Sequence, residues 1–231
     1  MDHLDSASEY NAYPQEFIHH HDKYHDYAWN ALLVDRVRNG WIRNVEFRDY
    51  NTGLLIYGSS AFTVSNAKCS GKKGPNSVHT RSSYGVLIKD SRDSAGHHHG
   101  PSVGYGSVGA VYLRYKAFKG QHMDSHTGNP FTTLFDNVNG NFDFNGGPYV
   151  SRPHHGKHLV AWNFKFEEGP TFYDFWPDVK TRNRYALPFM IGAHGQDVDF
   201  KSDSVASKES LGQRVEPESL FEAQLGLRLL P

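Results

Sequence analysis

Histidines and acidic residues gather in the middle of the chain. A triplet, His97 to His99, lies in a glycine-rich stretch, and His122, Asp124 and His126 follow within one short segment. Imidazole titrates near neutral pH, so it can accept or donate a proton, and its neutral form can also bind a metal ion. The chain has 15 histidines, and we expect most of them to be solvated. The pattern therefore predicts acid–base chemistry or a metal site only if the fold brings these segments together.

Short apolar runs recur along the chain and predict the elements that position these residues. The runs are ALLVDRV from Ala31, GLLIYGS from Gly53, GVLIKDS from Gly85, GAVYLRY from Gly109, TLFDNV from Thr133, LVAWNF from Leu159 and LPFMIG from Leu187. Each is short and rich in β-branched and aromatic residues, which is typical of strands. Their spacing of 22 to 32 residues indicates a repeat whose copies bury their apolar faces by stacking.

The fold class that fits this repeat is all-β, a right-handed parallel β-helix of roughly seven coils with a C-terminal helix. We expect the runs at 31–35, 54–57, 86–89, 110–114, 133–136 and 159–163 to stack in one parallel sheet. A leucine-rich repeat has a similar period, but its fixed Leu and Asn ladder is missing. A β-sandwich would need short hairpins, and no Asn-Gly turn joins two of the runs.

Three regions follow from this interpretation. Residues 1–28 are a polar and aromatic arm, residues 29–195 are the β-helix, and residues 196–231 are a polar linker with a packing helix near 216–230. The helix is expected to pack against the last coil or a neighbouring domain. The first coil has no obvious cap, and an exposed sheet edge is prone to association. We therefore expect an upstream domain, self-association or residues 1–28 to cover it.

Residues at equal offsets from matching strands should lie on one side of the solenoid. With Leu87, Val111, Leu134 and Val160 as matching positions, the histidine triplet and His122 fall on neighbouring coils. The predicted catalytic residues are His98, His99, Tyr105, His122, Asp124 and His126. The predicted substrate-binding residues are His79, Arg81, Asp143, Asn145, Arg152, His154 and His155. Both sets are expected to line one groove, and alanine replacement of the triplet is expected to leave folding intact.

A resemblance adds to this reading. The stretch from Phe62 to Arg114, which contains VHTRSSYGVLIKDSRDSAGHHHGPSVGYGSVGAVYLR, resembles a bacterial domain family of unknown function, as do PHHGKHLVAWNF and PESLFEAQLGLRL further on. The resemblance covers roughly residues 28–230. Such domains form the C-terminal part of longer parallel β-helix proteins associated with polysaccharides. The resemblance thus implies the fold and a carbohydrate context, and it assigns no catalytic residue.

Three functions stay open, and with them the question of whether the chain is an enzyme. A polysaccharide lyase needs a cation to neutralise a uronate carboxylate, a base and an acid, and arginine, histidine and tyrosine suit these roles. A glycoside hydrolase needs two carboxyl groups, which Asp124 with Asp143, or Asp90 with Asp93, could supply. A binding module would use aromatic platforms such as Trp162, Tyr173, Phe175 and Trp176. Histidine abundance favours the lyase.

Partners and cofactors follow from composition and charge. The net charge of −1 gives no indication of a nucleic-acid partner, and no apolar run is long enough to span a bilayer. The single cysteine, Cys69, excludes a cysteine-based zinc site, and we expect no metal ligand or cofactor, with calcium left open. The expected partner is a polysaccharide or oligosaccharide. Residues 1–20 lack a signal-peptide pattern, and the expected substrate predicts a secreted or periplasmic full-length protein.

Overall fold

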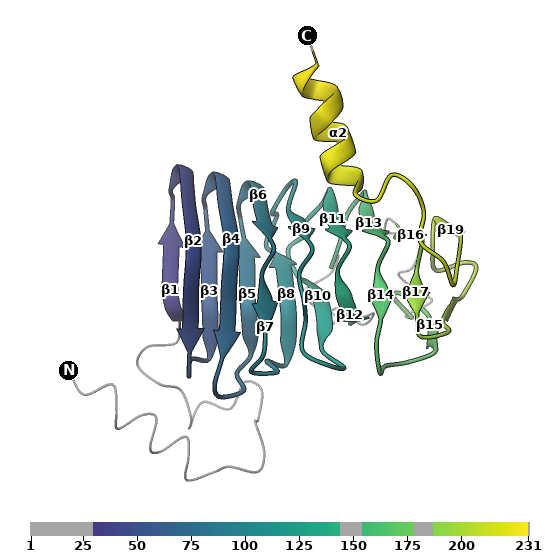
Figure 1. Cartoon of the computed structure of the whole chain (residues 1–231), viewed down its shortest axis with the longest axis horizontal. Helices are drawn as coiled ribbons and strands as arrows, with labels where there is room; N and C mark the ends of the chain where they lie inside the picture. Colours follow the sequence, from purple (N-terminus) through teal and green to yellow (C-terminus); the bar gives the residue numbers. More distant parts are fainter. Residues whose placement is uncertain (1–29, 144–153, 178–186, 231) are drawn as a thin grey trace, which may run out of the picture.

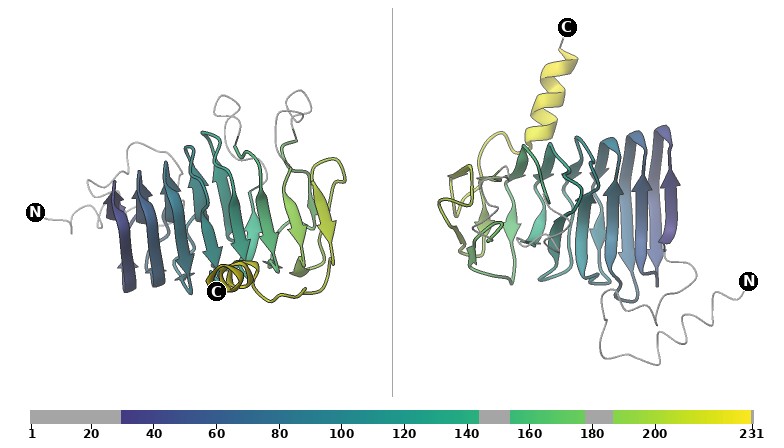
Figure 2. Two further views of the ribbon diagram at one scale, coloured as in Figure 1. Left: turned by 90° about the horizontal axis from the view of Figure 1, so that it is seen from above. Right: turned by 180° about the vertical axis from the view of Figure 1, so that it is seen from behind.

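The chain coils into a right-handed parallel β-helix of about seven turns (Figure 1). The computed structural model describes residues 30–143, 154–177 and 187–230. Within these residues every strand pairing is parallel, as the stacked strands in Figure 2 illustrate. The predicted fold class is therefore confirmed, including the C-terminal helix. None of the described helices is long and apolar enough to cross a membrane.

Two long sheets form the walls of the solenoid. Sheet A contains β1 (Asn30–Asp35), β3 (Thr52–Tyr57), β5 (Asn76–Arg81), β8 (His99–Gly104), β10 (His122–His126), β12 (Asn139–Phe142), β14 (Lys165–Phe166) and β17 (His194–Gly195), in this order. Sheet B contains β2 (Arg38–Arg48), β4 (Ser60–Ser70), β6 (Tyr84–Lys89), β9 (Val111–Leu113), β11 (Thr133–Asp136), β13 (Leu159–Trp162), β16 (Phe189–Ile191) and β19 (Ser207–Glu209). The short strand β7 (Arg92–Asp93) pairs with β4, and β15 (Phe172–Tyr173) pairs with β18 (Asp199–Phe200).

The core lies between the two sheets and is built from ladders of inward-facing side chains. In sheet B, Val64, Ile88, Tyr112 and Phe135 occupy one such ladder, and all are buried. Because side chains alternate along a strand, their neighbours face outward. The outward ladder Leu87, Val111, Leu134 and Val160 pairs in the predicted register and is half-buried. The register predicted for these four residues is therefore confirmed.

The expectation of a single sheet for the six apolar runs is wrong. The runs from Ala31 and Gly53 form β1 and β3 of sheet A. The other four runs, at 86–89, 110–114, 133–136 and 159–163, form β6, β9, β11 and β13 of sheet B. The unusually long interval between Gly53 and Gly85 marks this change of sheet. Both sheets turn every second side chain into the same core, so the composition of a run does not say which wall it joins.

A sharp corner recurs beside sheet B. At this corner one residue per coil has a left-handed backbone with φ of 50–56°: Asn44, Asn66, Asp90, Arg114, Asn137 and Asn163. Asparagine and aspartate tolerate this conformation better than other residues with a side chain. The side chains also stack, since Asn66 Nδ2 donates to Asn44 Oδ1 at 2.8 Å. The corner thus gives each coil a change of direction and places an asparagine at four of these six positions.

The solenoid continues beyond residue 195, the boundary expected from the sequence. β18 and β19 lie within 196–215, and β19 extends sheet B by pairing with β16. The helix α2 (Leu220–Leu229) then projects from the solenoid, as Figure 1 shows, and none of its residues is buried. It does not pack against the last coil. The expected arm 1–28 lies outside the described residues.

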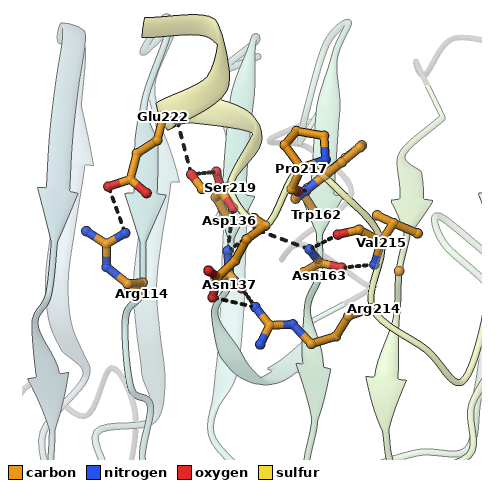
Figure 3. Close-up of polar contacts among 12 residues, drawn as sticks. Arg114, Asp136, Asn137, Trp162, Asn163, Arg214, Val215, Pro217, Ser219 and Glu222 are labelled. Atoms are coloured by element: carbon orange, nitrogen blue, oxygen red, sulfur yellow. Dashed lines mark hydrogen bonds and ion pairs between the residues drawn. The ribbon is translucent and has the colours of Figure 1, made fainter. Parts of the chain in front are cut away.

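The start of α2 is tied to the middle of the solenoid (Figure 3). Asp136 of β11 accepts hydrogen bonds from Ser219 Oγ and from Phe221 N, both at 2.8 Å, while Ser219 Oγ caps the helix by accepting from Glu222 N. A carboxylate at a helix N-terminus is favourable because free N–H groups and the helix dipole point toward it. Asn163 holds the segment before α2 through two hydrogen bonds with Val215, both at 2.8 Å. Its Nδ2 donates to the Val215 carbonyl, and its Oδ1 accepts from Val215 N. These contacts fix where α2 leaves the solenoid.

Candidate functional site

The histidine triplet belongs to a turn that follows β7. Asp93 Oδ1 accepts a hydrogen bond from Ala95 N at 2.8 Å, and Asp93 Oδ2 accepts from His97 N at 3.1 Å and contacts His97 Nδ1 at 2.9 Å. The side chains of Asp93 and His97 are buried, so this contact is shielded from water. His97 is therefore a structural residue that holds the turn. The expectation that all three histidines are dispensable for folding does not fit this burial.

Gln121 of the next coil locks the same turn. Its Nε2 donates to Asp93 Oδ2 at 2.6 Å and to the His97 carbonyl at 2.8 Å, and its Oε1 accepts from Phe118 N. Burial alone would raise the pKa of Asp93, but the hydrogen bonds from His97 and Gln121 outweigh burial and hold it below its usual value. Asp93 is thus a buried carboxylate that organises the loop.

The triplet lies against a cleft of about 520 Å³, and His98 is its exposed member. The polar side chains that line it are those of Lys73, His97, His98, His99, Lys119, Gln121, His122 and Asp143. His99 and His122 are register partners on β8 and β10, so the triplet lies beside His122 as predicted, and neighbouring strands lie about 4.8 Å apart. Phe118, which is exposed, lies at the same cleft and packs against Gly96. The cleft is thus made by residues of four successive coils, those of β5, β8, β10 and β12.

The surroundings of His98 and His122 favour their neutral forms. Burial, together with nearby His99 and Lys73, lowers the pKa of the His98 imidazole to about 4, while Asp143 opposes the shift. Burial also lowers the pKa of His122, Asp143 again opposes this, and His99 adds to the lowering. Both imidazoles are therefore neutral near pH 7, and each can accept a hydrogen bond from a bound molecule.

Two aspartates lie beside the histidines on the outer face of sheet A. Met123 and Phe142 point into the core and are register partners, so the next residues, Asp124 and Asp143, face outward on neighbouring coils. Ser102 Oγ donates to Asp124 Oδ2 at 2.9 Å. His99, Asp124 and Asp143 each offer one ligand atom, and these atoms lie within 4.8 Å of one another. The three side chains could hold a metal ion, although the sequence alone indicated no ligand set.

A second polar cluster lies on the same face, toward the C-terminal ends of β5 and β8. Arg81 places its guanidinium 4.5 Å from the centre of the Tyr105 ring, and its Nε lies 3.2 Å from the His79 ring nitrogens. His79 belongs to the outward row of Ser102 and Asp124 through the pairing of β5, β8 and β10. His79, Arg81 and Tyr105 are not among the residues that line the cleft. The structure therefore forms two clusters where one groove was expected.

The remaining predicted residues lie elsewhere. His155 is fully buried, with Nδ1 2.8 Å from the Gly156 carbonyl and Nε2 3.0 Å from Thr133 Oγ1, so it stabilises the coil and is not exposed to a substrate. His154 is also buried and packs near Trp176. The side chain of His126 and residues Asn145 and Arg152 lie outside the part of the chain that the structure describes.

The residues considered for two alternatives are not available to a substrate: the pair Asp90 and Asp93 of the hydrolase, and most aromatic platforms of the binding module. Asp90 is ion-paired with Arg114, and Asp93 is buried, so this pair does not face a common substrate. Three of the four candidate aromatic platforms, Tyr173, Phe175 and Trp176, are packed in the core. The fourth, Trp162, donates its indole N–H to the Pro217 carbonyl at 2.9 Å beside α2 (Figure 3).

Sequence reasoning missed the two lysines of the cleft. Lys73 precedes β5, and Lys119 lies before β10 and forms an ion pair with Glu168. Both belong to segments that interrupt the regular repeat, as the histidines do. The positions of the insertions could therefore have identified them, because insertions on one side of a solenoid form loops that neighbour one another.

The comparison with protein families covers the part of the chain that carries the cleft. The model of a family described as Domain of unknown function (DUF4955) matches residues 96–231, which is more than half of the chain. The chain belongs to this family. No curated protein and no solved structure matches it significantly. The matched part of this DUF4955 member includes His98, His99, His122, Asp124, Asp143 and α2, while Lys73, His79 and Arg81 precede it.

Proposed function

We propose that this protein binds an acidic polysaccharide in the cleft and cleaves it by β-elimination. The observation that carries the proposal is that His98 and His122 line one cleft together with Lys73 and Lys119. A parallel β-helix is consistent with a carbohydrate-active protein, since its rigid coils hold loops at fixed positions along a long polymer. Lysine ammonium groups attract the carboxylates of such a polymer.

The chemistry requires a base that removes a proton and a donor that gives one to the leaving oxygen. One neutral cleft imidazole removes the proton at C5 of a uronate and becomes an imidazolium, the C5–H electron pair forms the C4–C5 double bond, and the C4–O bond breaks. The leaving oxygen takes its proton from an imidazolium of the cleft, either directly or after transfer between the two histidines. The lysines stabilise the negative charge that builds up on the carboxylate during proton removal. His98 and His122 are assigned to proton transfer, and Lys73 and Lys119 to binding of the acidic sugar.

The geometry favours elimination over hydrolysis. A retaining glycosidase needs two carboxyl groups about 5–5.5 Å apart with the sugar between them. Asp124 and Asp143 are close enough, since their ligand oxygens lie within 4.8 Å, but Asp124 is only 2% exposed and does not line the cleft. Only Asp143 of the two lines the cleft, so the pair cannot flank a glycosidic bond there.

The test is an activity screen against uronate-containing polysaccharides, read by the ultraviolet absorbance of the unsaturated product and by a reducing-end assay. We expect both signals to rise together. Replacing the essential histidine, in His98→Ala or His122→Ala, should lower turnover by roughly 10²–10⁴-fold. His194→Ala is the matched control, because His194 lies on β17, distant in the stack from β8 and β10.

Other outcomes decide against the proposal. Reducing ends without an unsaturated product would indicate a hydrolase, and binding without cleavage would indicate a binding module. Lys73→Ala and Lys119→Ala should raise KM more than they lower kcat, because they are assigned to binding. A polysaccharide substrate also implies that the full-length protein is secreted or periplasmic, which fractionation of the native cells would test.

A further inference from the structure

We propose that His99, Asp124 and Asp143 form a binding site for one divalent transition-metal ion, with Zn²⁺ as the representative ion. The three ligand atoms lie within 4.8 Å of one another. Ligands bound to one Zn²⁺ at about 2.1 Å are at most about 4.2 Å apart, so small side-chain rotations complete the site. The site stands independently of the proposed elimination reaction.

The fold brings the three ligands together by register. They come from β8, from β10 and from the residue that follows β12, which are three consecutive strands of sheet A. Strand pairing sets His99 beside His122, and Asp143 N donates to the Met123 carbonyl at 2.9 Å. These backbone contacts hold the two aspartates on neighbouring coils. A site made this way is preorganised, because each ligand belongs to a strand or directly follows one.

Burial gives a reason for an ion at this position. Asp124 is 2% exposed and His99 is 5% exposed, while Asp143 is half-buried. Two carboxylates at such close range repel each other, and their repulsion grows as water is removed. A divalent cation between them offsets this repulsion. Ser102 donates to one oxygen of Asp124 and thereby orients the carboxylate, as hydrogen-bond partners of metal ligands commonly do.

The donor set selects the class of ion. One imidazole nitrogen with two carboxylate oxygens suits Zn²⁺ or Mn²⁺, whereas Ca²⁺ takes six to eight oxygen ligands and has no preference for imidazole. Three protein ligands also leave a coordination position open. Because Asp143 lines the cleft, that position would be accessible from the cleft. An anionic sugar group in the cleft could therefore complete the coordination, and this last step alone depends on the proposed function.

The test is titration of the chelator-treated full chain with Zn²⁺ and with Ca²⁺ in an isothermal calorimeter, without any saccharide. We expect one Zn²⁺ per chain, bound more tightly than Ca²⁺. Asp143→Asn should weaken Zn²⁺ binding at least tenfold, and Ser102→Ala should weaken it by roughly 10–100-fold. Asp199→Asn is the control, since the Asp199 carboxylate is exposed and belongs to the separate sheet of β15 and β18, and the variant should bind Zn²⁺ like the parent.

The outcomes that overturn the site are specific. They are the absence of saturable Zn²⁺ binding in the parent chain, or an unchanged Zn²⁺ affinity in Asp143→Asn. Calcium binding as tight as that of zinc would overturn the choice of a transition metal. Circular dichroism of each variant confirms that it is folded, and the half-buried Asp143 is the safest ligand to replace. The metal titration contains no saccharide, so it does not depend on the proposed reaction. If zinc binds and the elimination assay fails, only the proposed reaction is rejected.

Discussion

The two sheets of the solenoid use the same inward design but differ on their outer faces. Inside, both contribute apolar ladders such as Leu54 with Val78 from sheet A and Ile88 with Tyr112 from sheet B. Outside, sheet A carries the polar row His79, Ser102 and Asp124. Sheet B carries the apolar row Leu87, Val111, Leu134 and Val160 at the equivalent outward positions.

The difference shows how one repeat separates stability from function. The inward ladders determine the coil and most of its stability, so both walls must be apolar there. The outward rows carry no such constraint. Sheet A uses its outer face for the cleft and the clusters around it, whereas sheet B and its corner provide the attachment for α2, through Asp136 and Asn163 (Figure 3).

The largest effect that this comparison predicts is on the core of sheet B. Phe135→Ala should lower the free energy of unfolding by about 3–5 kcal/mol, because Phe135 is buried and stacks on Tyr112 at 4.9 Å between ring centres. Leu134→Ala, which removes the adjacent outward side chain, should cost clearly less. Urea denaturation of both variants measures the difference. Equal losses would mean that the outer row contributes as much to stability as the core.

Acid should weaken the fold through His155. Burial lowers its pKa to about 4 in the folded chain, against an ordinary value near 6.5. The unfolded chain therefore binds the proton first, and stability falls as the pH drops from about 6.5 to 4. Full protonation costs about 3 kcal/mol. Urea denaturation as a function of pH should show this decline, and His155→Gln should make it smaller. A parallel decline in both proteins would assign the acid sensitivity to other groups.

Two neighbouring histidines, His97 and His98, should differ in their effect on stability, because the first is structural and the second lines the cleft. His97→Ala should lower the free energy of unfolding by about 2–3 kcal/mol, because it leaves the buried Asp93 carboxylate short of a hydrogen bond. His98→Ala, at an exposed position in the cleft, should change stability by less than about 0.5 kcal/mol. The two variants are compared in the same denaturation experiment. A stable His97→Ala protein would contradict the role assigned to Asp93.

The smallest effect concerns the attachment of α2. Ser219→Ala removes the helix cap and the bond to Asp136, and should destabilise α2 by about 1 kcal/mol. Hydrogen exchange should accelerate in Leu220–Leu229 and remain unchanged in the strands, because none of the side chains of α2 is buried. Leu227→Ala, at a 72% exposed position, is the control. Faster exchange throughout sheet B would show that α2 supports the solenoid.

The sequence by itself determined the solenoid and part of the site. Periodic short apolar runs can bury their faces only by stacking, so the coil and its approximate period follow from the sequence. Counting from Leu87 and Val111 placed the histidine triplet beside His122. The equal offset of eleven residues points to His98, and the register partner of His122 is His99, one residue further on. The same counting placed Asp124 close to them.

Only the tertiary structure decided the rest. Whether a run joins sheet A or sheet B depends on the corner before it, since alternation is the same in both walls. His97 turns inward because Asp93 and Gln121, on different coils, meet it in three dimensions. The convergence of His99, Asp124 and Asp143 depends on strand pairing combined with the bulge between β8 and β10. The same is true of α2, whose cap bonds to Asp136, a residue far earlier in the chain. Contacts of this kind join positions that are distant in sequence, so they depend on how the coils pack and not on any local pattern of residues.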